Sequence, residues 1–170
     1  MTRISPRDDK GALAEAQQDK THTGVSEEVI PYGKFVMVGS NTLSGTNYES
    51  NQGVKVFDGT TGQHILGIAK QSLEPGMDDD QYDANQPVEI GRSGIYLAEV
   101  DANSTGVSVG DTLAVMPSGD VMAESDLSSG SGEYAVTLEN SEFVTSGAAG
   151  DIVVVELNMP CKQVETQLAA

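Results

Sequence analysis

Between residues 29 and 159 the sequence alternates short apolar runs with clusters of turn-forming residues, and this alternation limits the possible folds more than any other feature. The runs are too short for helices of ordinary length, and glycine, proline, asparagine or aspartate interrupts them repeatedly. We expect strands at residues 34–38, 54–57, 64–69, 88–91, 94–100, 112–116, 121–123, 133–138 and 151–159. About eight or nine short strands predict an all-β fold, namely a small barrel or a β-tulip or sandwich.

Two turns and the last apolar run give the clearest local signals. Asp58-Gly59 separates two β-rich runs, and glycine supplies the positive φ that a tight turn needs. Residues 117–120 (Pro-Ser-Gly-Asp) combine a glycine with a proline that presets φ, which also predicts a turn. Residues 151–159 are apolar at most positions, and this pattern predicts a central strand covered on both faces.

The length of 170 residues fits one domain with a single hydrophobic core. Residues 1–28 contain no aromatic side chain and are rich in polar and charged residues, so they predict an extended N-terminal arm. A tail without a role is the alternative for this segment. We therefore expect an arm at residues 1–28, a β domain at 29–161 and a C-terminal tail at 162–170.

The formal net charge is -17, and the excess lies beyond the predicted arm. Residues 71–161 hold 17 acidic side chains and a single base, Arg92. Such a field repels phosphate backbones, which argues against nucleic acid as a partner. Either a saline environment or a surface that must repel its neighbours accounts for the acidity.

The sequence also argues against a membrane partner. No run of about 18 apolar residues is present, as a membrane-spanning helix would require. The basic residues near the N-terminus are not followed by the apolar segment of a secretory signal. We therefore expect synthesis in a cytoplasm.

Few residues are suited to catalysis. The two histidines are His22, in the predicted arm, and His64, at the start of a predicted strand, and neither has an evident catalytic partner. Residues 91–94 (Gly-Arg-Ser-Gly) place a serine near glycines, but they do not match the Gly-x-Ser-x-Gly elbow. We expect a non-enzymatic protein with no catalytic, cofactor-binding or metal-binding residues and no cofactor.

Three other features leave alternatives open. The acidic loop at residues 78–83 offers oxygen ligands for Ca²⁺, but its spacing does not fit an EF-hand, so a solvated loop is favoured. Cys161, the only cysteine, predicts a free or half-buried thiol, with an intermolecular bridge as the alternative. We expect Arg92 to pair with Glu89 or Glu99, or with a carboxylate of a partner.

Five segments resemble, in order and approximate spacing, the structural cement (decoration) proteins of tailed double-stranded DNA viruses. They are residues 53–57, 65–70, 88–97, 107–115 and 141–158, of which the last is the most specific. Each segment alone is only a strand with a turn, so the ordered set carries the resemblance.

The resemblance implies a compact β-barrel or β-tulip-like domain that forms a homotrimer on the surface of a virion capsid and stabilises the mature lattice. It also implies contacts with a major capsid protein of the HK97 type, an arm lying along the capsid, synthesis in the host cytoplasm and no catalytic residues. The alternative is a carbohydrate- or ligand-binding β module of a virion or cell surface. An aromatic cleft, or Ca²⁺ bound at residues 78–83, would distinguish that alternative.

Overall fold

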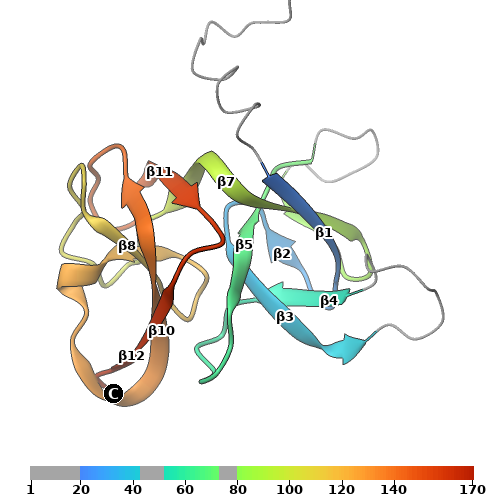
Figure 1. Cartoon of the computed structure of the whole chain (residues 1–170), viewed down its shortest axis with the longest axis horizontal. Helices are drawn as coiled ribbons and strands as arrows, with labels where there is room; N and C mark the ends of the chain where they lie inside the picture. Colours follow the sequence, from blue (N-terminus) through green and yellow to red (C-terminus); the bar gives the residue numbers. More distant parts are fainter. Residues whose placement is uncertain (1–19, 43–51, 73–79) are drawn as a thin grey trace, which may run out of the picture.

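The computed structural model describes residues 20–42, 52–72 and 80–170, which form an all-β fold with two lobes (Figure 1). The predicted fold class is therefore confirmed. The strands are β1 (Lys20–Ser26), β2 (Ile30–Pro31), β3 (Phe35–Thr42), β4 (Gln52–Val56), β5 (Ile65–Ala69), β6 (Gln81–Tyr82), β7 (Pro87–Glu99), β8 (Thr112–Val115), β9 (Val121–Ala123), β10 (Ser129–Phe143), β11 (Ile152–Asn158) and β12 (Gln163–Leu168). A 3-10 turn, η2 (Glu124–Asp126), follows β9. Within the described residues, no helix is long and apolar enough to cross a membrane.

The first lobe is a closed barrel of five strands. Its hydrogen-bonding order is β1–β4–β3–β5–β7, and β7 pairs with β1 to close the ring. Val36 of β3, Val54 of β4 and Ile90 of β7 belong to its apolar core. The short β2–β6 sheet adds Ile30 and Tyr82 to this barrel core. Closure leaves these five strands without a free edge, which removes a common site of unwanted strand pairing.

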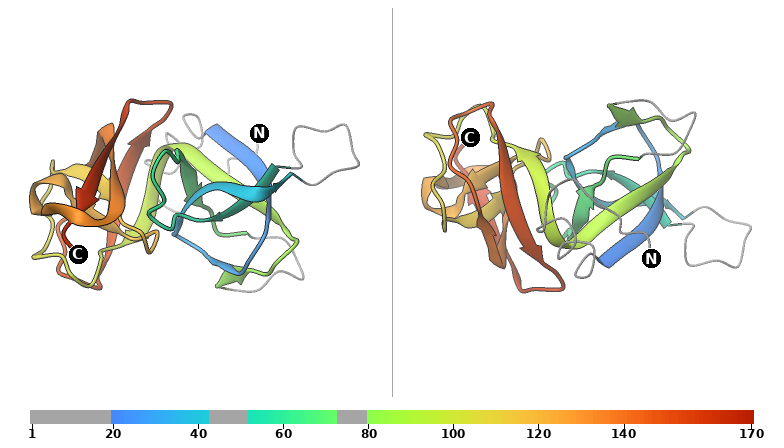
Figure 2. Two further views of the ribbon diagram at one scale, coloured as in Figure 1. Left: turned by 90° about the horizontal axis from the view of Figure 1, so that it is seen from below. Right: turned by 90° about the horizontal axis from the view of Figure 1, so that it is seen from above.

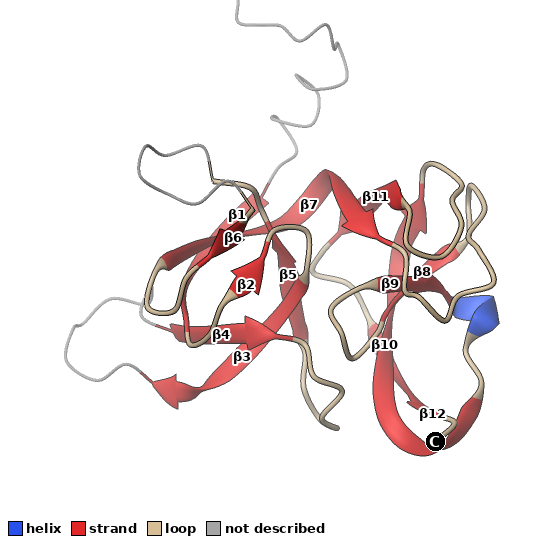
Figure 3. Ribbon diagram, turned by 180° about the vertical axis from the view of Figure 1, so that it is seen from behind, coloured by secondary structure: helices blue, strands red, loops and turns tan. Residues whose placement is uncertain are grey.

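The long strand β7 belongs to both lobes. Its residues 87–93 pair with β1 in the barrel, whereas residues 93–99 pair with β11 in the part of the same continuous sheet that lies outside the barrel, which we call the second sheet. That sheet continues from β11 to β10, β8 and β9, and β12 also pairs with β10. Figure 2 shows β7, in yellow-green, passing from one lobe to the other, and Figure 3 shows the same path from behind.

Gly91 lies two residues before Ser93, where β7 changes from β1 to β11, and a side chain would not fit there. A Cβ atom added at Gly91 would stand 2.5 Å from Cε1 of Tyr96. The hydroxyl of Tyr96 donates a hydrogen bond of 2.8 Å to the carbonyl of Ser93, which holds the ring in place. The glycine at the start of residues 91–94 is therefore explained by packing between the two halves of β7.

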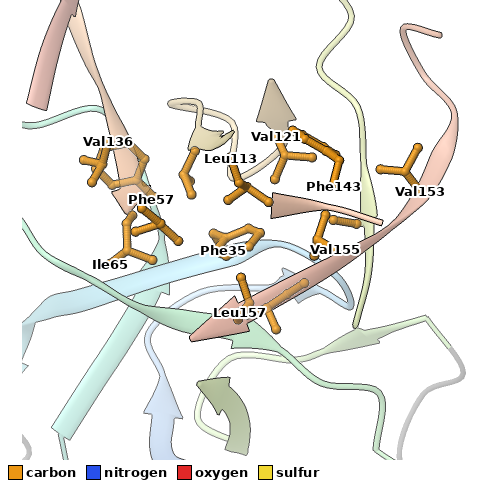
Figure 4. Close-up of a cluster of buried hydrophobic side chains, with 14 of the residues drawn as sticks. Phe35, Phe57, Ile65, Leu113, Val121, Val136, Phe143, Val153, Val155 and Leu157 are labelled. Carbon is orange, nitrogen blue, oxygen red and sulfur yellow. The ribbon is translucent and has the colours of Figure 1, made fainter. Parts of the chain in front are cut away.

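A junction core joins the barrel to the second sheet. It includes Phe35, Met37, Phe57, Ile65 and Ile68 from the barrel side and Leu113, Val115, Val121, Val136, Leu138, Phe143, Val153, Val155 and Leu157 from the other lobe. Figure 4 shows Phe35 and Phe57 among the valines and leucines of the second sheet. β3 is buried on both sides, since Val36 belongs to the barrel core while Phe35 and Met37 belong to the junction core. Burial of each large apolar side chain contributes roughly 1.5–3 kcal/mol.

The two turns that the sequence predicted lie where the lobes meet. In the 117–120 turn, the carbonyl of Gly119 accepts a hydrogen bond of 2.9 Å from the amide of Phe35. Asp120 of the same turn forms an ion pair with Lys34, and their side chains are only 13% and 20% exposed. In the other turn, the carbonyl of Gly59 accepts a 3.0 Å hydrogen bond from the amide of Tyr134. Polar contacts thus surround the junction core.

Two strands lie in segments that the sequence assigned to the arm and the tail. β1 occupies residues 20–26 and closes the barrel, so the described fold begins before Val29. β12 occupies residues 163–168 and pairs with β10. Both strands are polar in sequence. In β1, Ser26 is buried, and its Oγ donates a hydrogen bond of 3.2 Å to the carbonyl of Gln86 and accepts one of 3.0 Å from the Gln86 amide. Backbone pairing, rather than apolar alternation, places these two strands.

Candidate functional surface

The two histidines occupy different elements of the barrel lobe. His22 lies in β1 opposite Ile90 of β7, on paired backbone and not on an arm as the sequence suggested. His64 is exposed immediately before β5. In the parts of the chain that the structure describes, no hydrogen bond joins either imidazole to a serine or a carboxylate. The absence of a catalytic site therefore stays a prediction.

The expected ion pairs of Arg92 with Glu89 or Glu99 are not found among residues 20–42, 52–72 and 80–170. Instead, Glu99 lies 4.0 Å from Nζ of Lys34. Arg92 sits where β7 leaves β1 for β11, and its carbonyl accepts a hydrogen bond of 2.9 Å from the amide of Met159. A contact between Arg92 and a carboxylate of a partner stays a prediction.

Cys161 is a free, half-buried thiol, as the sequence predicted. It packs against the junction core. Burial raises the pKa of the Cys161 thiol, the nearby Glu139 carboxylate raises this pKa further, and Arg92 lowers it. The thiol is therefore a weak nucleophile at neutral pH, because only the thiolate attacks efficiently.

The acidic loop that the sequence offered as a cation site is only partly described, because residues 73–79 lie outside the described ranges. Asp80 and Asp83 are exposed, while Tyr82 between them is buried and donates a hydrogen bond of 2.6 Å to the carbonyl of Lys70. No group of three or more His, Cys, Asp or Glu side chains in the described residues could hold a metal ion. Cation binding at residues 78–83 remains untested.

Aromatic side chains in the described segments serve mainly to fill the interior. Phe35, Phe57 and Phe143 are completely buried. Tyr82 is also buried, and its ring meets that of Tyr32 edge to face with a centroid distance of 5.0 Å. Aromatic rings that are buried in the core cannot stack on a sugar at the surface.

One face of β11 is only partly covered, although the sequence predicted a strand covered on both faces. Val153, Val155 and Leu157 point into the junction core (Figure 4). Ile152, on the opposite face, is 62% exposed. The prediction is therefore wrong for this face within a single chain, because Ile152 lies at the surface and Val154 is only half-buried.

An apolar row crosses three neighbouring segments on this exposed face. Leu97 of β7 is directly opposite Val154 of β11, and the carbonyl of Val154 accepts a hydrogen bond of 2.8 Å from the amide of Val144. Side chains directly opposite each other point to the same face of a sheet. Leu97 is 61% exposed and Val144 is 36% exposed. We call the outward side of β7 (residues 95–99), of β11, of the end of β10 and of Val144, which follows β10, the β7–β11 face.

Carboxylates border this apolar row. Glu142 of β10 is directly opposite Glu156 of β11, which in turn is opposite Ile95 of β7. On the other side of the row, Glu99 is opposite Ile152. The β7–β11 face therefore has an apolar centre with acidic groups beside it, and none of these paired positions holds Lys or Arg.

Two other carboxylates have lowered pKa values because they accept hydrogen bonds from neighbouring residues. The Thr105 hydroxyl and amide, together with the Ser104 hydroxyl, donate hydrogen bonds that lower the pKa of Asp126. For Asp58, burial raises the pKa, but hydrogen bonds from Lys55 and Thr60 outweigh it and leave the pKa below its usual value. These groups stabilise turns and form no shared site.

Comparison with known proteins places the chain in a family. Residues 9–158 match the family described as structural cement protein (E217 gp24/Pam3 gp6). The chain belongs to this family. The cement protein is thus a structural protein of a virion capsid, which confirms the resemblance seen in the sequence. Its strand β12 lies beyond the matched residues.

A solved structure supports the fold of the cement protein. A chain from the structure titled "The capsid of Myoviridae Phage XM1" has a TM-score of 0.60, with 85% of this chain and 86% of that chain covered. The two sequences are 17% identical, so this likeness concerns the fold. No curated protein gives a significant match.

Proposed function

We propose that the cement protein binds the outside of an icosahedral capsid, contacts a major capsid protein of the HK97 type and has no enzymatic activity. The family match over residues 9–158 is the observation that carries this proposal. A protein that binds only the mature lattice adds its binding free energy to that state alone. Such binding stabilises the assembled shell by mass action.

The active unit in this proposal is a homotrimer. Three linked copies bind a symmetric lattice more strongly than one copy with the same weak contact, because the second and third contacts form at high effective concentration. The net charge of -17 would keep neighbouring trimers and whole particles apart in solution. The protein would thereby stabilise each shell without joining separate shells.

The proposed capsid-binding arm is restricted to residues 1–19, which lie outside the described residues. Deletion of residues 1–28, the whole segment that the sequence assigned to the arm, would remove β1 and open the barrel. Deletion of residues 1–19 leaves β1 in place. We expect this shorter deletion to give a folded protein with weakened capsid binding, and undiminished binding would exclude a docking role for the segment.

The test of the proposed function uses capsids prepared from a virus lacking this protein. The full chain should co-sediment with mature capsids, and it should raise the temperature at which they rupture. Unexpanded capsids serve as the control, because they lack the mature lattice. Failure of the full chain to bind mature capsids, or an unchanged rupture temperature at saturation, would reject the proposed function.

A further inference from the structure

We propose that the β7–β11 face is the surface through which the folded part of the cement protein contacts the capsid, in addition to the arm at residues 1–19, and that its partner is a protein surface with an apolar centre and Lys or Arg side chains around it. This inference rests on the proposed function. It adds to that function the face that makes the contact and the chemistry of the surface that receives it.

The apolar character of the β7–β11 face indicates that another molecule covers it. When an antiparallel sheet has one face on the core, its other face usually meets water and carries polar side chains. Here Leu97 and Ile152 are 61% and 62% exposed, and Val154 is directly opposite Leu97. Contiguous exposed apolar side chains on a soluble protein mark a surface for interaction.

An unfavourable pair of charges on the same face indicates that the partner is basic. Glu142 and Glu156 are directly opposite each other on adjacent strands, and like charges in such positions destabilise a sheet. Neither carboxylate forms an ion pair among the residues that the structure describes. A basic side chain from a partner would relieve this repulsion, and the planar fork of arginine suits carboxylates best.

The same charges argue against a second copy of this chain as the occupant. In a trimer each copy meets the next through two different patches, so a copy could cover this face only with a patch that carries basic side chains around an apolar centre. The chain holds only nine Lys and Arg side chains against 26 Asp and Glu, so such a basic rim is scarce on a copy. A different protein with a basic rim therefore fits the face better than a copy does.

The decisive variant is Leu97→Thr/Ile152→Thr in the full chain. Threonine keeps the preference for strand conformation while removing most of the apolar side chain. The dissociation constant for mature capsids that lack the cement protein should rise at least about tenfold. A second variant, Glu142→Gln/Glu156→Gln, should weaken binding and make the dissociation constant less sensitive to salt, because charge attraction to the basic rim is lost.

The control is Val29→Thr/Val164→Thr, which changes two exposed apolar residues outside this face to threonine. Val29 is 48% exposed before β2, and Val164 is 37% exposed in β12. This control should bind capsids as the unsubstituted chain does. Thermal unfolding of every variant, compared with the unsubstituted chain, verifies that the fold is retained.

Three results would overturn the inference, and they differ from one another. Equal capsid affinity of the Leu97→Thr/Ile152→Thr variant and the unsubstituted chain shows that the contact lies elsewhere, while the proposed function survives. A change in oligomeric state by light scattering, whether or not the capsid affinity falls, shows that the face joins copies of this chain. No binding by the unsubstituted chain rejects the proposed function itself.

Discussion

The side-chain amide of Gln163 pairs with the backbone of Ile65 as a neighbouring strand would. Its Oε1 accepts a hydrogen bond of 2.8 Å from the Ile65 amide, and its Nε2 donates one of 2.9 Å to the Ile65 carbonyl. Glu165, two residues further along β12, accepts hydrogen bonds from the Gly62 amide and the Thr61 hydroxyl. The last strand is therefore fastened to the barrel by side chains.

Replacing Gln163 with alanine should destabilise the protein by about 1–3 kcal/mol, because the amide and carbonyl of Ile65 both lose a part-buried partner. Denaturant unfolding measures this change. Gln167→Ala is a suitable control, since Gln167 donates a single hydrogen bond, to the carbonyl of Gly132. If Gln163→Ala lowers the free energy of unfolding no more than Gln167→Ala does, the two hydrogen bonds between Gln163 and Ile65 do not have the stabilising role given to them.

The ion pair between Lys34 and Asp120 should contribute to stability because neither side chain is well solvated. Lys34→Met leaves Asp120 without its cation, and we expect a loss of about 1–3 kcal/mol in the free energy of unfolding. The matched control is Lys162→Met, which removes an exposed pair with Glu139 at 3.3 Å and should cost less than about 1 kcal/mol. Equal losses of unfolding free energy in Lys34→Met and Lys162→Met would show that the partly buried ion pair contributes no more than the exposed one.

Gly91→Ala should be strongly destabilising because the added Cβ would meet the Tyr96 ring at 2.5 Å. We expect the free energy of unfolding to fall by about 1–3 kcal/mol. If the clash is the cause, the Gly91→Ala/Tyr96→Leu pair should be less damaging than the sum of the two single changes. A double-mutant cycle by thermal or denaturant unfolding provides the measurement, and simple additivity would count against the packing explanation.

The Cys161 thiol should react slowly with an alkylating reagent in the folded protein. Burial and Glu139 raise its pKa, so the thiolate fraction at a given pH is smaller than in the unfolded chain. Glu139→Gln should move the pH profile of alkylation to lower pH, because it removes the nearby negative charge. A profile unchanged by this substitution would show that burial alone controls the thiol.

Asp126 should contribute to stability above the pKa of an unfolded aspartate and lose that contribution in acid. Hydrogen bonds from Thr105 and Ser104 hold its folded pKa below the unfolded value of about 3.9, so the contribution disappears as the pH falls through the folded pKa. The gap in unfolding free energy between the unsubstituted chain and Asp126→Asn should therefore narrow below about pH 4. A gap that stays constant from neutral pH to about pH 3 would disprove this linkage.

The sequence was informative wherever apolar alternation and turn chemistry agreed. The runs at residues 34–38, 112–116 and 121–123 correspond to β3, β8 and β9, because buried apolar side chains lie between strong turn signals. The 117–120 turn was recognised for the same reason. The runs at 88–91 and 94–100 became one strand, β7, since Gly91 and Gly94 lie inside the ladder.

Long-range backbone pairing was the part that local sequence did not reveal. β1 and β12 are held by partners distant in the chain, and their polar residues resemble those of a loop. The prediction of a strand covered on both faces at residues 151–159 fails on one face for a related reason. Apolar side chains there indicate that both faces avoid water, but they do not indicate what covers each face. The alternation could not distinguish coverage by the same chain from coverage by a partner.

The sharing of β7 between the two sheets also has a mechanical consequence. A force that pulls the lobes apart along this strand acts on its covalent backbone and on rows of hydrogen bonds perpendicular to it. Bonds loaded side by side in shear must break together, unlike those at a sheet edge that peels open one at a time. A capsid movement that pulled the two lobes in opposite directions would therefore be resisted by β7, which connects them as a stiff element and not as a hinge.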